Sequence, residues 1–172
     1  MQKIKIYKKN GFYKLKATQN INAKIEDIWE YFTEIKNLEK IMPNKYNTKV
    51  TQGRKSKLYL GKIFNIRMKI LPFVYTNITS EIKAIEKERL FIDSQIFGPY
   101  KMWHHEHHFI LNKDKSIQIL DIVTYKLKNI PFMKILHKIF LKKEIVKTFY
   151  HRANRIKYFF KNKYRMSKPK NN

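Results

Sequence analysis

The middle of the chain is a run of strand-like segments separated only by tight turns, and this run constrains the fold more than any other feature. The segments lie near residues 46–52, 57–69, 74–86, 89–96, 101–111 and 116–127. Turn-forming residues separate them at Gln52–Gly53, Leu71–Pro72, Gly98–Pro99 and Asn112–Asp114. Connections this short join antiparallel neighbours, because a parallel crossover needs a dozen or more residues. The sequence therefore predicts an antiparallel meander.

Helical patterns flank this meander on both sides. A first strand is expected from about Phe12, with residues 3–7 available for a short extra strand, and residues 23–32 and 35–41 are expected to form two short helices. A long helix is predicted after Pro131 from apolar residues at spacings of three, four and seven, namely Ile135, Ile139, Val146, Phe149, Ala153, Ile156 and Phe160. Residues 132–141 are apolar nearly all round and are predicted to form a separate short helix. The fold class is therefore α+β, in one domain over residues 1–166 with a disordered basic tail at 167–172.

Composition excludes several classes of protein. The chain has no cysteine, which rules out disulfides, thiolate metal sites and cysteine nucleophiles. No apolar run is long enough to cross a bilayer, and the N-terminus alternates lysine with isoleucine instead of carrying a signal-peptide block. With four glycines, a phosphate-binding loop is hard to place. We therefore expect a cytoplasmic protein that is, at most, peripheral to the membrane.

The formal charge of +25 suggests a phosphate-bearing partner, either nucleic acid or anionic membrane. Only six of the 38 basic residues are arginine, the residue that makes bidentate contacts to bases. The chain is rich in lysine and also in isoleucine, asparagine and tyrosine, a composition typical of proteins from an AT-rich genome. Specific nucleic-acid binding is therefore not expected, and a basic adaptor for RNA or anionic membrane is kept as an alternative function.

The stretch from Gly98 to Phe109 contains four histidines in a predicted strand. Successive side chains of a strand point to opposite faces, so the stretch divides into two rows. The first row holds Trp103, His105, His107 and Phe109. The second row holds His104, Glu106, His108 and Ile110. Large aromatic rings alternating with imidazoles suit the wall of a partly polar cavity, whereas the second row is typical of a solvated face.

Two hairpin turns, at Gly98–Pro99 and near Lys113, fix which residues face this row across the ladder. The expected pairs are Asp93 with His105, Gln95 with Trp103, His107 with Asp121, and Trp103 with Tyr125. Two histidine–carboxylate pairs are thus predicted inside an otherwise apolar pocket. The predicted ligand-binding residues are Asp93, Gln95, Trp103, His105, His107, Phe109, Asp121, Val123 and Tyr125.

Three roles are open for these histidines. They can be structural residues that are hydrogen-bonded to Asp93 and Asp121. They can also orient the polar end of a hydrophobic ligand, or serve metal binding or acid–base catalysis. The absence of a nucleophile elbow or of metal-ligand spacing in the sequence weighs against catalysis. No catalytic residue, metal site or cofactor is therefore predicted.

The order of elements, together with several motifs, resembles the bacterial ligand-binding (SRPBCC) branch of the START-like superfamily. That superfamily groups the birch-pollen allergen family, polyketide cyclases and lipid-transfer START domains. The resemblance is carried by Ile21–Ala23, Ile28–Phe32, Asn37–Pro43, Phe91–Gln95, residues 98–109, Asp121–Tyr125 and Phe149–Arg152. It implies a helix-grip fold, in which a curved seven-stranded antiparallel sheet wraps around a long C-terminal helix. It also implies a cavity between the sheet and that helix for hydrophobic or amphipathic small molecules.

The predicted function is the binding, with or without transport, of such a small molecule. The alternative from another class is a cyclase- or hydrolase-like enzyme that uses His105 and His107 as acid–base groups. Phe132, Met133 and Phe140 are expected at the cavity entrance, where an apolar segment beside lysines would contact an anionic membrane.

Overall fold

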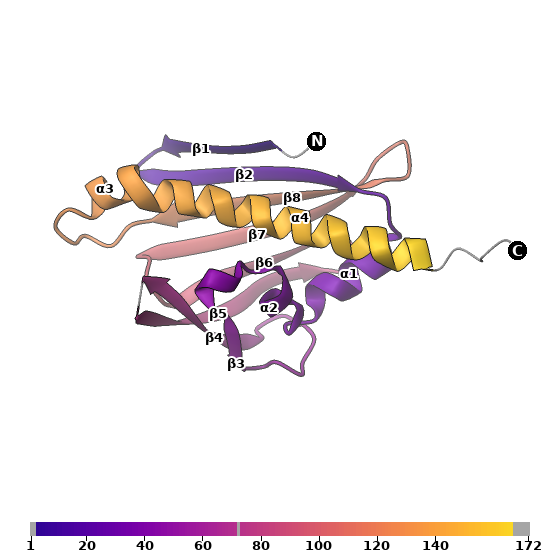
Figure 1. Cartoon of the computed structure of the whole chain (residues 1–172), viewed down its shortest axis with the longest axis horizontal. Coiled ribbons are helices and arrows are strands. Elements are labelled where there is room, and N and C mark those ends of the chain that lie inside the picture. The colour runs from indigo at the N-terminus through magenta and orange to yellow at the C-terminus, as the bar shows by residue number, and fades with distance from the viewer. Residues whose placement is uncertain (1–2, 72, 167–172) are drawn as a thin grey trace, which may run out of the picture.

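Eight antiparallel strands form one open, curved sheet in the computed structural model, which describes residues 3–71 and 73–166 (Figure 1). The strands are β1 (Lys3–Lys9), β2 (Phe12–Ile21), β3 (Lys49–Gln52), β4 (Ile63–Leu71), β5 (Val74–Glu86), β6 (Leu90–Phe97), β7 (Met102–Leu111) and β8 (Ile117–Lys126). Their order across the sheet is β1-β2-β8-β7-β6-β5-β4-β3. The meander predicted from the short turns therefore runs from β3 to β8, and β2 joins it at the β8 edge.

The sheet has eight strands, and the expected number of seven was wrong. The additional strand is β1, which pairs along its whole length with β2. Asn10 and Gly11 connect the two strands, both with positive φ, as a tight two-residue hairpin requires. Ile4 and Ile6 pack against the second core cluster described below, so the strand is held by apolar contacts as well as by its ladder.

Six helical segments accompany the sheet within the described ranges. They are α1 (Ile25–Thr33), α2 (Asn37–Ile41), the 3-10 turn η1 (Asn44–Tyr46), α3 (Met133–Leu136), the π-helical turn η2 (His137–Leu141) and α4 (Lys142–Met166). The chain forms no separate helix over 132–141, because α3 and η2 run directly into α4. The strand expected over 57–69 begins at Ile63, and residues 53–62 form turns with a single bridge between Glu34 and Lys57.

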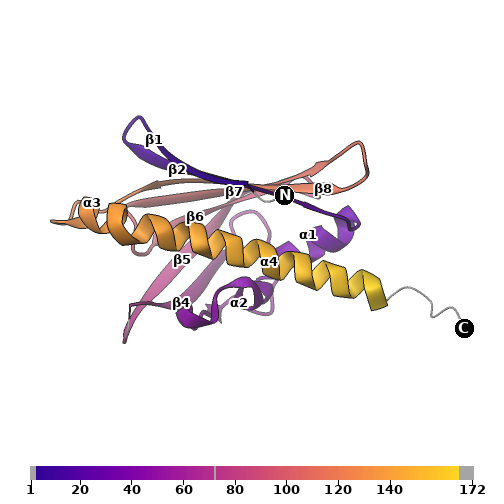
Figure 2. The same ribbon diagram turned by 45° about the horizontal axis from the view of Figure 1, so that its top comes forward.

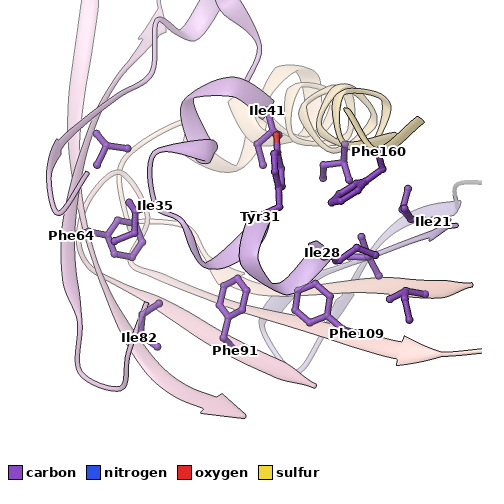
Figure 3. Packing of buried hydrophobic residues seen from close by; sticks show 14 of the residues in the cluster. Ile21, Ile28, Tyr31, Ile35, Ile41, Phe64, Ile82, Phe91, Phe109 and Phe160 are labelled. Atoms are coloured by element: carbon purple, nitrogen blue, oxygen red, sulfur yellow. The ribbon is translucent and has the colours of Figure 1, made fainter. Parts of the chain in front are cut away.

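Helix α4 lies against one face of the curved sheet, in the arrangement of a helix-grip fold (Figures 1 and 2). Its apolar stripe packs on the sheet at one end and on α1 and α2 at the other. Figure 3 shows Ile28 and Tyr31 of α1 between the sheet residues Phe91 and Phe109 and the α4 residue Phe160. This arrangement forms the larger core cluster, which holds most of the buried aliphatic residues.

A second, smaller cluster lies under the first half of α4. Its buried members are Leu15, Ala17, Val123, Tyr125, Ile145 and Phe149. Polar contacts also fasten α4 at both ends, since Glu144 pairs with Lys45 and Lys163 pairs with Asp27. No helix within the described ranges is both long and apolar enough to cross a membrane. The tail predicted at residues 167–172 lies outside the described residues.

Candidate functional site

Strand β7 divides its side chains between the two faces of the sheet as the alternation predicts. His105, His107 and Phe109 are each 4–5% exposed and lie on the face covered by α4. The row on the opposite face was expected to be solvated, but the side chains of His104, Glu106 and His108 are only about one-third exposed. They are partly buried because they bond one another and their neighbours: Ser94 with His104, and Glu106 with His108.

The register of the ladder brings the predicted partners opposite one another. Asp93 pairs with His105, His107 with Asp121, and Trp103 with Tyr125. The β6–β7 ladder ends one pair before Gln95, whose side-chain amide instead donates to the backbone oxygen of Tyr100 at 2.8 Å.

Gln95 therefore braces the β6–β7 turn. A Cβ on Gly98 would lie 2.3 Å from Gln95 Oε1, so any larger residue there would displace the Gln95 amide from this position.

The hydrogen bonds between these groups run diagonally and not along the cross-strand pairs. His105 Nε2 and Asp121 Oδ1 are 3.0 Å apart, and His107 Nε2 and Asp93 Oδ2 are 3.1 Å apart. The remaining nitrogen of His107, Nδ1, lies 3.0 Å from Asp121 Oδ1 without the alignment of a hydrogen bond. The two imidazole rings lie side by side with centroids 3.7 Å apart. We call these four residues the histidine–aspartate cluster.

The pKa values of the two histidines of this cluster shift in opposite directions. Burial, reinforced by the charge of His107, lowers the pKa of His105 to about 4. Burial also acts to lower the pKa of His107, but hydrogen bonds and charge from Asp121 and Asp93 outweigh it and raise that pKa. The pKa of each aspartate lies below its usual range because the histidines outweigh the desolvation of the carboxylate. As the pH falls, His107 therefore takes up a proton before His105 does.

A group of aromatic residues continues the row toward the turn at Gly98. Trp103 lies with its ring centroid 5.5 Å from that of Tyr125 and 4.8 Å from that of Tyr100. The Tyr13 ring stacks on Tyr125 with centroids 5.3 Å apart, and it contacts His137 in a tilted arrangement with centroids 4.1 Å apart. We call these five residues the aromatic cluster. Burial raises the pKa of both Tyr100 and Tyr125, so both hydroxyls stay protonated in the physiological range.

Three members of the aromatic cluster were not predicted. Tyr13 shares a face of β2 with the buried Leu15 and Ala17, so strand parity could have found it. Tyr100 follows the turn and carries no periodic signal. His137 is a lone polar residue in an otherwise apolar segment, and it becomes buried because η2 turns it toward Tyr125.

The remaining predicted ligand residues lie in two different places. Val123 is fully buried beside His105, between the histidine–aspartate and aromatic clusters. Phe109 packs edge-on against Trp29 and Phe32 in the larger core cluster. The structure therefore brings eight of the nine predicted ligand-binding residues together on the neighbouring strands β6, β7 and β8. The ninth, Phe109, contributes to the core under α1.

A pocket of about 260 Å³ opens at the end of this row. It lies between the β6–β7 turn and the segment that follows β8, and it is lined by Gln95, Ile96, Phe97, Gly98, Tyr100, Lys101, Lys128 and Asn129. Gln95 and Tyr100 connect it to the aromatic cluster. A second hollow, of about 600 Å³, lies between the start of α1 and the β7–β8 turn and includes none of the predicted residues.

The segment from α3 to η2, which carries Met133 and Phe140 and directly follows Phe132, lies at the same end of the molecule as the β6–β7 turn (Figure 1). Phe132 is 80% exposed and Phe140 is 39% exposed, whereas Met133 is partly buried. Phe73, at the tip of the β4–β5 hairpin, is 93% exposed. Phe73 and Phe132 both have a left-handed backbone, with φ of 64° and 61°, which is rare for bulky side chains.

Comparison with solved structures identifies the fold. Protein Ms6760 from Mycobacterium smegmatis superposes with a TM-score of 0.68 at 16% identity, covering 94% of this chain and 99% of that one. Major latex-like protein 151 from Panax ginseng gives 0.62 at 14% identity, covering 88% and 99%. A norcoclaurine synthase mutant from Thalictrum flavum, in complex with a transition-state analogue, gives 0.61 at 15% identity, covering 94% and 97%.

These likenesses establish the helix-grip fold of START-like proteins, the class to which the sequence motifs pointed. No family model and no curated protein matches the sequence itself. One of these neighbours, the norcoclaurine synthase, is named as an enzyme, and at 16% identity or less the likenesses show the fold alone.

Proposed function

We propose that the protein binds a hydrophobic or amphipathic small molecule at the end of the sheet where the aromatic cluster meets the pocket at Gln95 and Tyr100. The observation that carries this proposal is the continuity between an open pocket and a buried row of aromatic and polar side chains. Ligand sites typically combine an apolar lining with a few polar groups that orient the ligand. Here the rings of Tyr100 and Trp103 supply the apolar lining, and the Gln95 amide supplies a polar group that orients the ligand.

The pocket volume limits the size of what it encloses. Sites for drug-sized molecules usually measure about 300–1,000 Å³, and this pocket measures about 260 Å³. It therefore holds either a small aromatic compound as a whole or one end of a larger molecule. The rest of a larger molecule would lie on exposed side chains such as Phe97. Lys101 and Lys128 at the rim favour a ligand that carries a negative group.

The two tryptophans allow a direct test. Trp103 belongs to the aromatic cluster, whereas Trp29 packs in the core against Phe91 and Phe109. The amphipathic anion 8-anilinonaphthalene-1-sulfonate should bind saturably and receive excitation energy mainly from Trp103. Trp103→Phe should remove most of that transfer, and Trp29→Phe should retain it.

A lining variant tests whether the pocket itself holds the probe. Tyr100→Ala should weaken its binding at least tenfold, while the control Tyr158→Ala, exposed on α4, should leave it unchanged. Equal affinity of wild type and the Tyr100 variant would refute the proposed location. Native mass spectrometry of the untagged protein would then identify the molecule that co-purifies with it.

We further propose that this end of the molecule contacts an anionic membrane. Residues 126–143, the lysine-rich segment, contain six lysines and no acidic residue. The same segment exposes large apolar side chains at Ile130, Phe132, Ile135, Leu136, Ile139 and Phe140. Apolar groups that insert and lysines that attract anionic headgroups, each contributing about 1 kcal/mol near the surface, together form a typical interfacial anchor.

Vesicle co-sedimentation tests this contact. Binding to vesicles of phosphatidylglycerol and phosphatidylcholine is expected at low salt, with a marked loss at high salt and little binding to phosphatidylcholine alone. Phe73→Ser combined with Phe132→Ser should reduce binding severalfold, and Tyr158→Ser should not. Sedimentation that is indifferent to anionic lipid would count against the membrane contact.

An acid–base enzyme is the second candidate, because the two buried histidines hold pKa values driven apart in the manner of a general acid and a general base. Double replacement of His105 and His107 by glutamine separates the two functions. A binding protein with this change should show altered affinity for the identified ligand, whereas an enzyme should bind the ligand and lose turnover.

A further inference from the structure

The orientation of the two imidazole rings in the histidine–aspartate cluster places their nitrogens in two sets. His105 Nδ1 and His107 Nε2 both face Asp93 Oδ2, at 3.7 and 3.1 Å. His105 Nε2 and His107 Nδ1 both face Asp121 Oδ1, each at 3.0 Å. Each carboxylate therefore lies against one nitrogen of each ring.

We propose that Asp93, His105 and His107 are the ligands of a divalent transition-metal site of the Zn²⁺ class, with Asp121 as the carboxylate that orients both histidines. One ligand atom from each of the three residues lies within 4.8 Å of the others. A four-coordinate ion with bonds of about 2.0–2.1 Å holds its ligand atoms roughly 3.3 Å apart. The separations of 3.1 and 3.7 Å from Asp93 bracket that value.

The position of Asp121 supports this assignment independently of Asp93. Histidines that ligate a metal usually give their second ring nitrogen to a carboxylate, which fixes the tautomer and ring orientation. Asp121 occupies that position for both rings at once. His107 Nδ1 is buried 3.0 Å from Asp121 Oδ1 and has no aligned hydrogen bond.

The side chains of both carboxylates are partly exposed, at 16% for Asp93 and 12% for Asp121, whereas those of the histidines are 5–6% exposed. An ion would therefore enter from the carboxylate side of the cluster. Three protein ligands with one open position are typical of zinc sites that bind a further molecule. The site goes beyond the proposed function, and its test does not depend on the organic ligand.

Sequence spacing did not predict this site, because the convergence of the nitrogens depends on ring orientation. The row on the opposite face provides a matched control. His104, Glu106 and His108 are also close together, with Glu106 oxygens at 4.0 and 3.0 Å from the two histidines, but these side chains are about one-third exposed and have no orienting carboxylate behind them.

Calorimetric titration of Zn²⁺ into the untagged, chelator-treated full chain tests the proposal. One saturable site per chain is expected, with proton release that is visible as a dependence of the heat on the buffer. Co²⁺ should occupy the same site and give the visible absorption bands of four- or five-coordinate cobalt. Wild type that lacks a saturable site with a dissociation constant below about 10 μM would overturn the proposal.

Four variants locate the ion. His107→Gln and Asp93→Asn should each weaken Zn²⁺ binding at least 100-fold, and Asp121→Asn should weaken it about 10- to 100-fold with unchanged stoichiometry. The control with both His104→Gln and His108→Gln should bind as wild type does. Circular dichroism checks each fold. If His107→Gln does not fold, the Zn²⁺ affinity of Asp93→Asn tests the proposal, because the Asp93 side chain is more exposed than that of His107. Wild-type affinity in Asp93→Asn, or loss of binding in the control alone, would show adventitious binding on the other face.

Discussion

The Tyr125 hydroxyl and His137 Nε2 share a hydrogen bond of 2.8 Å, which joins the last strand of the sheet to the π-helical turn that precedes α4. Both residues are buried, and the Tyr13 ring contacts both of their rings. π-helical turns occur often at functional sites. Here the turn places an imidazole over the aromatic cluster and so positions the lysine-rich segment beside the pocket.

Loss of this bond should destabilise the protein measurably. Tyr125→Phe leaves His137 Nε2 buried without a partner, which typically costs about 1–3 kcal/mol. Urea denaturation at pH 7.5 gives the free energy of unfolding. The control Tyr150→Phe, on the exposed side of α4, should change it by less than about 0.5 kcal/mol. Equal stability of Tyr125→Phe and wild type would mean that water replaces the lost hydroxyl.

The sequence predicted the cross-strand neighbours of the histidines because two turns of fixed length determine the register of β6, β7 and β8. A shift of one residue would have moved every side chain to the other face. The diagonal bonds of His105 to Asp121 and His107 to Asp93 could not be predicted, because they depend on side-chain torsions that register does not determine.

Other features escaped prediction for different physical reasons. The contribution of Tyr100 and His137 arises in a turn and in a π-helical turn, neither of which has a periodic signature. β1 was predicted only as a short extra strand because its alternation covers few residues and its outer edge is unpaired in the described sheet. Phe109 follows the parity of β7, yet it meets α1 and not the pocket, because the sheet extends beyond the end of the cavity row.

The low pKa of His105 should make the protein less stable in acid. Its folded-state pKa of about 4 lies below the unfolded value of 6.5, so the unfolded chain binds the proton preferentially. The corresponding stability is fully present above pH 6.5 and lost as pH falls toward 4, by on the order of 3 kcal/mol. The free energy of unfolding at pH 4.5, 5.5, 6.5 and 7.5 measures this loss. His137 and His151, whose pKa values burial also lowers, add to it.

His105→Gln should therefore reduce the loss of stability with falling pH without abolishing it.

His107→Gln should change the pH dependence of stability above pH 6.5. The folded-state pKa of His107 is raised, so its stabilisation is present below pH 6.5 and is lost as pH rises through the folded value. That variant should lose the decline in stability above pH 6.5. Unchanged slopes in both variants would contradict the opposite pKa shifts of the two histidines.

The two aspartates should contribute unequally to stability. Asp121 lies 3.0 Å from both imidazoles, whereas Asp93 lies at 3.1 and 3.7 Å, and the side chain of Asp93 is 16% exposed against 12% for Asp121. Asp121→Asn should cost about 3–5 kcal/mol, since it removes the carboxylate that hydrogen-bonds the buried His105 and lies beside His107 Nδ1. Asp93→Asn should cost less. The exposed pair of Glu86 with Arg89 provides the control, because Glu86→Gln should cost under about 1 kcal/mol.

Phe132 offers a way to separate membrane contact from stability. Its left-handed backbone costs about 1–2 kcal/mol for a residue with a Cβ, and its side chain is 80% exposed. Phe132→Gly should therefore leave the free energy of unfolding unchanged or raise it by about 1 kcal/mol, while binding to anionic vesicles falls. A destabilised Phe132→Gly variant would indicate that the ring packs against the protein and not against lipid.

Ile28 tests whether the two core clusters unfold together. It is fully buried on α1 between Phe109 of the sheet and Phe160 of α4, so Ile28→Ala removes apolar contacts to both layers (Figure 3). The expected cost is about 2–5 kcal/mol. Trp29 and Trp103 report on the larger core cluster and the aromatic cluster separately. Coincident fluorescence transitions in Trp29→Phe and Trp103→Phe backgrounds, both shifted equally by Ile28→Ala, are expected because α4 packs against both clusters. A shift confined to the Trp29 signal would show that the sheet end carrying the pocket folds without α1.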